Sequence, residues 1–360
     1  MVRETTGSFR DIIIHPGETL KEALEDRAMT QKQLAQSIGM TEQHISRIIK
    51  GKTNISGRCA KKLEYALGIP ASFWMNLQRN YDLELAEYQD RNNISDEEYT
   101  IFEKIRDIMA EILSLKGESL EGDKTFGVIQ ARRTFRLSSL LHIPDVMPDA
   151  LYRKSKTANI DEYVTFAWLR LCDCHLEGIP KPEAGDPATL LEHIEDIKGL
   201  MFGDDIYKTL RSLQSLLRSI GIRFAVVRHF PGAPIHGMTR KNPDSTLDLC
   251  LTVRGSRADI FWFSLFHEFA HIILEDFDDI GYSYSKESEQ IADRQAASLL
   301  ISDELYTEFV KKRDFSYNSI AALAESSNVP EYIIIGRLQN DGYLPWQHSY
   351  NRYVPMYKWQ

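Results

Sequence analysis

The stretch FWFSLFHEFAHIILE, residues 261–275, constrains this chain more than any other. Apolar side chains flank it on both sides and predict a buried helix, yet His267, Glu268 and His271 lie in its middle. Residues four apart share one helical face, so both imidazoles can face a single ion while Glu268 lies beside the first. This H-E-x-x-H spacing is typical of zinc sites. We therefore predict that His267 and His271 are ligands of Zn²⁺ and that Glu268 is a catalytic base.

A second segment offers the third ligand that a catalytic zinc requires, since the fourth position is left to water. KESEQIADRQAASLLI begins about fifteen residues after His271, and its Glu289 and Asp293 share one helical face. Glu289 is the predicted ligand, and Asp293 is predicted to accept a proton from a ligand histidine and fix its tautomer. Glu287 is a rival ligand, although its spacing to Asp293 does not suit one face.

The alternative is a core in which the two histidines only hydrogen-bond to each other or to neighbours. An unpaired carboxylate in such apolar surroundings would be costly, and a bound dication makes the burial of Glu268 understandable. With a metal present, Glu268 would take a proton from water and pass it to the amine that leaves a cleaved peptide bond. Candidates for stabilising the oxyanion are His236, Tyr282 and Tyr284.

The first 80 residues predict a helix-turn-helix. Thr30 and Gln33 form a capping box at the start of one helix. Gly39 permits a sharp turn, and Thr41 caps the next helix. Such a second helix lies in the DNA major groove with its outward residues toward the bases. A small helical docking domain with solvated lysines is the alternative. The residues predicted to contact DNA are Thr41, Glu42, Gln43, His44, Arg47, Lys50 and Lys52.

Within this set the side chains differ in their expected roles. Gln43 can pair with adenine and Arg47 with guanine, whereas Lys50 and Lys52 would hold phosphates. Charge supports the assignment: residues 1–80 carry twelve Lys/Arg against eight Asp/Glu, although the whole chain has a net charge of −9. A basic N-terminal region followed by an acidic remainder suggests that only the N-terminal region binds a polyanion.

Patterning along the chain predicts a mainly α protein with a small antiparallel β-sheet, an α+β fold. The strand-like patterns lie between residues 221 and 253, and the remainder shows helical spacing. The predicted domains are a helix-turn-helix domain (1–92), a helical connecting region (93–200), a zinc metallopeptidase domain (201–310) and a C-terminal helical tail (311–360). The tail mimics a helix-turn-helix but carries few outward basic residues, so a packing role is favoured over DNA contact.

Other features set the expected compartment. No apolar run reaches the length of a membrane helix, and the N-terminus lacks the pattern of a signal peptide. The four cysteines form no spaced framework, so reduced thiols in the cytoplasm are expected. Cys172, Cys174 and His175 form a C-x-C-H motif without a second ligand pair, which is a weak metal signal.

Two stretches resemble known families. Residues 12–85, with the distinctive GIPASFWMNLQ at 68–78, resemble HigA-type antitoxins of the XRE helix-turn-helix family. This resemblance implies a homodimer that binds a palindromic operator in double-stranded DNA. Residues 201–345, with SRADIFWFSLFHEFAHIILE and EQIADRQAASLLI, are similar to ImmA/IrrE metallopeptidases, some of which cleave helix-turn-helix repressors. That similarity implies His267, His271 and Glu289 as ligands and Glu268 as the base.

This chain departs from the usual pattern of the second family. Ile291, Asp293 and Gln295 stand where E-x-E-A-N and R-F-A are common, which bears more on substrate choice than on zinc. We predict a DNA-binding, antitoxin-like regulator with a zinc-dependent endopeptidase domain that cuts a partner protein. We expect this partner to be a repressor. A non-enzymatic HigA-like antitoxin with a structural zinc domain that binds a toxin is the alternative, and a free-standing protease localised by its N-terminal region is a third possibility.

Overall fold

The computed structural model describes residues 13–147, 161–182, 186–233, 237–253, 256–275 and 286–357. The chain divides into two compact units, Met1–Asp96 and Glu97–Gln360. The first boundary therefore falls four residues after the predicted end of the helix-turn-helix domain. Among the described helices, none combines the length and the apolar character needed to cross a bilayer.

The described part of the first unit is a bundle of five helices, and local capping sets their boundaries. Thr30 and Gln33 form the predicted capping box, Gly39 adopts the left-handed conformation (φ 60°), and the side chain of Thr41 accepts from the backbone N–H of His44. A core of leucine, isoleucine and alanine with Trp74 holds the bundle together. The helices are α2 (Pro16–Glu25), α3 (Gln31–Ile38), α4 (Glu42–Ile49), α5 (Gly57–Leu67) and α6 (Ala71–Asn92).

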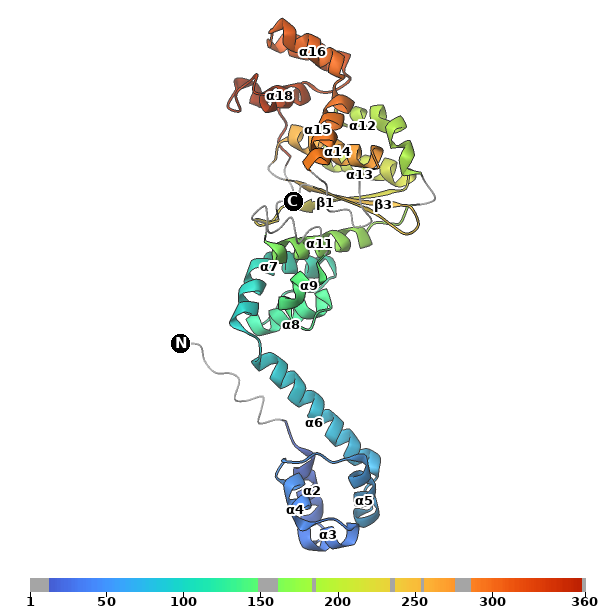
Figure 1. Ribbon diagram of the computed structural model, residues 1–360, viewed down its shortest axis with the longest axis vertical. Helices are drawn as coiled ribbons and strands as arrows, with labels where there is room; N and C mark the ends of the chain where they lie inside the picture. Colours follow the sequence, from blue (N-terminus) through green and yellow to red (C-terminus); the bar gives the residue numbers. More distant parts are fainter. Residues whose placement is uncertain are drawn as a thin grey trace. The chain divides into compact units, whose positions relative to one another are not determined.

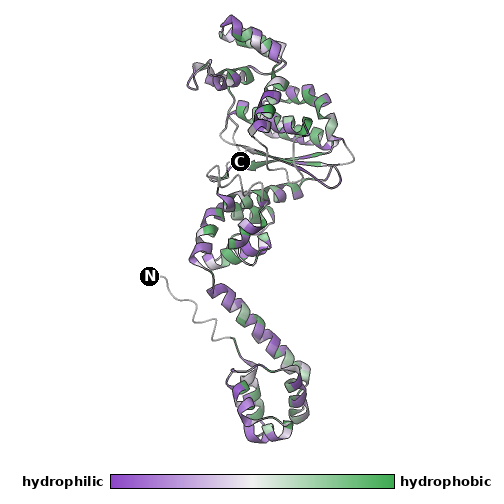
Figure 2. Cartoon of the chain, viewed as in Figure 1, coloured by the Kyte–Doolittle hydropathy of each residue, from purple (hydrophilic) through white to green (hydrophobic). Residues whose placement is uncertain are grey.

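The last helix of the first unit, α6, has few buried residues. Figure 2 shows α6 as hydrophilic over much of its length, in keeping with its two buried residues, Trp74 and Gln78.

The second unit begins with a series of helices before its sheet. Those that the structure describes are α7 (Asp96–Leu115), α8 (Lys124–Phe135), η1 (Leu140–His142), α9 (Ile143–Val146), α11 (Glu162–Glu177), η2 (Pro187–His193), α12 (Ile194–Leu200) and α13 (Ile206–Ser219).

The sheet is mixed, so the predicted antiparallel sheet is wrong in one pairing. Its strands are β1 (Ile222–Arg228), β2 (Gly237–Lys241) and β3 (Leu247–Val253), in the order β1-β3-β2. β2 and β3 form the expected antiparallel hairpin, but β1 pairs with β3 in parallel. The chain after β1 crosses to the far edge before it returns through the middle, and short-range turn signals do not reveal such a crossover.

Both faces of the sheet are covered, which explains why the central strand β3 is buried from residue 247 to 252. Figure 1 shows α11 on one side of the sheet and α13 and α14 (Ala258–Ile273) on the other. Alternate residues of the strands therefore face different partners. Leu247, Leu249 and Leu251 join the apolar cluster beneath α14.

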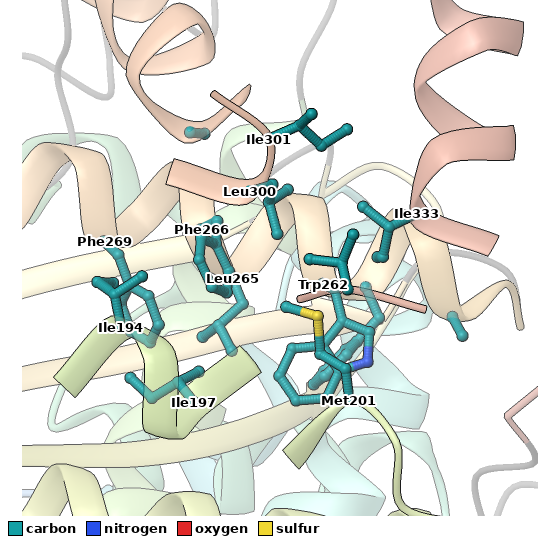
Figure 3. Packing of buried hydrophobic residues seen from close by; sticks show 14 of the residues in the cluster. Ile194, Ile197, Met201, Trp262, Leu265, Phe266, Phe269, Leu300, Ile301 and Ile333 are labelled. Carbon is teal, nitrogen blue, oxygen red and sulfur yellow. The ribbon is translucent and has the colours of Figure 1, made fainter. Parts of the chain in front are cut away.

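α14 crosses this core with apolar side chains on most of its surface. Trp262, Leu265, Phe266 and Phe269 are fully buried and contact residues from both earlier and later helices (Figure 3). The same cluster contains residues on both sides of the predicted boundaries at 200 and 310. The finer division of the second unit stays a prediction.

The C-terminal helices complete the unit. They are α15 (Lys286–Leu300), α16 (Asp303–Lys312), α17 (Tyr317–Ser326), α18 (Glu331–Asn340) and η3 (Ser349–Tyr353). Six of the ten residues of α18 are buried, and Arg337 donates to the carbonyls of Ala297 and Ile301. The helix-turn-helix-like tail therefore serves packing, as predicted.

Candidate functional site

The predicted DNA-contacting residues lie together on and just after α4. Ile45 and Ile48 point into the core of the bundle, and this orientation turns the opposite face of the helix outward. Six of the seven predicted residues are exposed, and His44 is half-buried. Glu42 lies in the first turn, while Lys50 and Lys52 follow the last turn. The seven side chains therefore lie on or beside one helix that Thr41 caps.

α4 is held in place by the start of α2. A Cβ on Gly17 would lie 2.1 Å from the carbonyl oxygen of Ile48, so only glycine allows this approach. His15 caps α2 through Nδ1, which accepts from the N–H of Gly17 at 2.9 Å. Burial lowers the pKa of His15 despite the nearby carboxylates of Asp82 and Glu18. The neutral form that this cap requires is thereby favoured.

In the second unit, α14 and α15 bring the three predicted metal ligands together. Ligand atoms of His267, His271 and Glu289 all lie within 4.8 Å of one another. Nε2 of His267 is 3.1 Å from Nε2 of His271 and 3.2 Å from Oε2 of Glu289. Two ligands at about 2.0–2.1 Å from a tetrahedral zinc are about 3.3 Å apart. The donor types and the two spacings from Nε2 of His267 thus fit a zinc ion.

Asp293 fixes the ring of His267 from the other side. Its Oδ1 lies 2.9 Å from Nδ1 of His267, which leaves Nε2 directed at His271 and Glu289. Burial lowers the pKa of His267, but the hydrogen bonds with Asp293 and Glu289 and the charge of Glu268 outweigh it and raise the pKa to about 10. Three carboxylates around two imidazoles make this a place that favours positive charge.

Glu268 is buried beside this group and is held by the edge strand β2. Thr239 Oγ1 donates a hydrogen bond to Glu268 Oε2 at 2.8 Å. Glu268 is 4% exposed and Thr239 is fully buried. The backbone of Gly237 lies against the other carboxylate oxygen, because a Cβ at this position would be 2.2 Å from Oε1. The sequence did not single out Thr239, although a G-x-T pattern places both residues on one face of a strand.

Small residues let the two helices of the site approach. Ala292 and Ala296 of α15 are fully buried and join the apolar cluster that surrounds α14. Glu287, the rival ligand, is exposed and is not among the three grouped residues. Cys172, Cys174 and His175 form no such group among the residues described. The oxyanion candidates His236, Tyr282 and Tyr284 lie outside the described residues.

A second polar cluster lies on the opposite face of the sheet, and sequence patterns gave no sign of it. Asp248 is fully buried on β3 and accepts from Arg223 on β1 and from Arg240 on β2. Arg240 also donates to Asp173 on α11. Burial alone would raise the pKa of Asp248, but the bonds from both arginines outweigh it and hold the pKa below its usual range. This cluster joins the three strands to α11.

Comparison with known proteins concerns the first unit. Residues 20–74 match the family model described as helix-turn-helix. Virulence-associated protein I of Dichelobacter nodosus is 34% identical over 83 residues, which are 23% of this chain and 76% of that protein. Antitoxin HigA-1 of Vibrio cholerae is 37% identical over 82 residues, 22% of this chain and 73% of that protein.

A solved structure of Pseudomonas aeruginosa antitoxin HigA with the higBA promoter is 31% identical; the match covers 23% of this chain and 96% of that one, with a TM-score of 0.21. The family model and the two sequence relatives agree with the capped helices α3 and α4. Through its first unit, the chain belongs to the XRE-type helix-turn-helix family of DNA-binding regulators that includes the HigA antitoxins.

Proposed function

We propose that this chain is an operator-binding regulator of the HigA type whose second unit is a zinc-dependent peptidase. The first half of the proposal is supported by the outward polar face of α4 in a unit that belongs to this family. Gln43 and Arg47 would contact base edges, and Lys50 and Lys52 would contact phosphates. Binding as a homodimer to a palindromic site is part of the proposal, because two copies of one reading helix match two half-sites.

The DNA-binding half is tested with the full-length chain and DNA of its own promoter. Binding should weaken steeply as salt rises, since each contacted phosphate releases condensed counterions. Fluorescence anisotropy at several salt concentrations measures the slope. A flat response, or equal affinity for a scrambled duplex, would contradict an operator-reading α4.

The peptidase half is supported by one observation above others, the gathering of His267, His271 and Glu289. A zinc ion, when bound there, would polarise a peptide carbonyl and lower the pKa of a bound water toward about 7. Glu268 is the buried carboxylate next to the first ligand, and in this proposal it would take a proton from water and return it to the leaving amine. Asp293 holds the ring of His267 in the required orientation.

The proposed substrate is a partner protein, and we propose a repressor, because residues 201–345 resemble ImmA/IrrE peptidases and some of these cleave repressors. The non-enzymatic alternative, a structural zinc domain that docks a toxin, calls for a closed site, because structural zinc ions are usually held by four protein ligands. Among the residues that the structure describes, the grouped ligands number three, and Glu268 is buried beside them.

Glu268→Gln separates the two versions. The variant keeps shape and loses the base, so we expect unchanged zinc content and DNA affinity but at least a 100-fold loss of cleavage. Cleavage is followed by mass spectrometry of candidate repressors incubated with the zinc-loaded protein. A variant that cleaves as fast as wild type would remove the proposed base. A protein that binds zinc tightly but cleaves nothing with or without Glu268 would favour the structural role.

A further inference from the structure

The edge strand β2 contributes two residues to the surroundings of Glu268. Gly237 and Thr239 are two apart in a strand, so they face the same side, toward α14. Thr239 bonds to one carboxylate oxygen and Gly237 makes room for the other. Met238, between them, faces the other side of the sheet. The carboxylate is therefore held by a strand that is separate in sequence from the helix that carries it.

The two oxygens of the Glu268 carboxylate have different neighbours. The hydroxyl of Thr239 occupies Oε2 at 2.8 Å. Oε1 lies over the backbone of Gly237, where a methyl group would clash at 2.2 Å. A glutamate side chain has several rotatable bonds, and ordering it has an entropic cost. A bond from a rigid strand supplies that order before any reaction begins.

We propose that Thr239 is a positioning residue that holds the carboxylate of Glu268 in the orientation in which it accepts a proton, and that Gly237 provides the space this orientation needs. The inference rests on the proposed peptidase function. It assigns a role to the sheet edge that the ligand set does not include. Thr239 acts through Glu268 and does not itself meet the reacting atoms.

The test uses a probe that requires the base but no turnover. Acetohydroxamic acid binds zinc as its anion, and its O–H proton passes to a nearby carboxylate, which becomes a carboxylic acid. Its affinity for the zinc-loaded, full-length protein is measured by titration calorimetry. Thr239→Val keeps the shape and removes the donor. We expect about 5- to 30-fold weaker binding with unchanged zinc content, because a carboxylate that the strand no longer holds must be ordered when the probe binds.

Two variants separate positioning from a merely structural role. Thr239→Ser restores the donor and should return the affinity to within about threefold of wild type. Thr252→Val makes the same change at another buried threonine of the sheet, on β3 and on the face away from α14, and should leave the affinity unchanged. A loss in Thr252→Val equal to that in Thr239→Val would mean general damage to the sheet and would overturn the proposal.

Gly237→Ala disturbs the same carboxylate at its other oxygen, Oε1. The backbone of Gly237 is not in the left-handed region, so alanine is compatible with its conformation, but the new methyl must displace Glu268. We expect a loss of hydroxamate affinity even though Thr239 is intact. If the chain cleaves a peptide, Thr239→Val should lower kcat with little change in KM, because the bond matters after substrate has bound.

The possible failures are distinguishable. Wild-type protein that binds zinc and hydroxamate, together with a Thr239→Val variant that matches it, overturns the positioning role and leaves the peptidase proposal standing. Failure of Thr239→Ser to restore affinity also overturns it. Wild-type protein that binds neither zinc nor hydroxamate rejects the proposed function, and this inference with it.

Discussion

The two units keep their candidate functional polar groups in opposite environments. In the first unit, six of the seven candidate DNA contacts on and beside α4 are exposed on the surface of a small apolar bundle. On α14 of the second unit Glu268 and His271 are buried; Thr239 donates a hydrogen bond to Glu268, and Glu289 is grouped with His271 and His267. Exposed groups can be changed one at a time, whereas buried groups depend on partners that must change with them.

The largest expected effect concerns the buried polar cluster beneath the sheet. Asp248→Asn leaves Arg223 and Arg240 without their shared anion, and we expect the free energy of unfolding to fall by about 3–5 kcal/mol at pH 7. Urea unfolding followed by tryptophan fluorescence measures it. Asp204→Asn, which changes an exposed carboxylate before α13, should stay close to wild type.

The same variant carries a pH signature. The pKa of Asp248 is lowered in the folded state, so its stabilising contribution is present above the ordinary value of about 4 and is lost as pH falls through the folded value. The difference between wild type and Asp248→Asn should therefore be constant near neutral pH and shrink below about pH 4. A difference that grows on acidification would contradict the ion cluster.

A middle-sized effect is expected at the ring of His267. Asp293→Ala removes the carboxylate that orients the ring, and zinc affinity should fall by about 10- to 100-fold. Competition with a chromophoric chelator measures the change. Glu287→Ala removes an exposed carboxylate from the same helix and should have no effect. Equal losses in both variants would mean that the ligand group is assigned wrongly.

The smallest effect is expected in the first unit, and it sharpens the contrast. Lys52→Ala should leave folding unchanged and reduce the slope of log affinity against log salt by about one, the share of a single phosphate contact. Lys311→Ala, an exposed lysine on α16, is the control and should leave the slope unchanged. A stability loss in Lys52→Ala would contradict this contrast between the two units, because it would mean that an exposed side chain of the first unit stabilises the fold.

Local signals allowed much of this molecule to be predicted. The caps at Thr30 and Thr41, the turn at Gly39 and the spacing of His267 and His271 all act within one or two turns of a helix. Glu289 followed from the same helical periodicity. The parallel pairing of β1 with β3 did not follow, because it joins residues about 25 positions apart whose side chains suit either direction.

The partners of buried groups were also beyond prediction. Asp248 and Arg223 each lie in strand-like patterns, and nothing in their spacing reveals that they meet. Thr239 is one threonine among many until the sheet brings it to Glu268. Interactions between elements arise only after the elements are arranged, so the candidate ligands and Asp293 could be predicted from helical spacing, but Thr239 and the partners of Asp248 could not.

The independence of the first unit has a consequence for the newly made chain. All of its helices lie within the first 96 residues, and the remaining 264 follow it. At a synthesis rate of about 5–20 residues per second, the bundle has on the order of ten seconds or more to fold before α14 and α15 have been translated. A nascent or prematurely terminated chain would then carry a folded helix-turn-helix before it carries the candidate ligands.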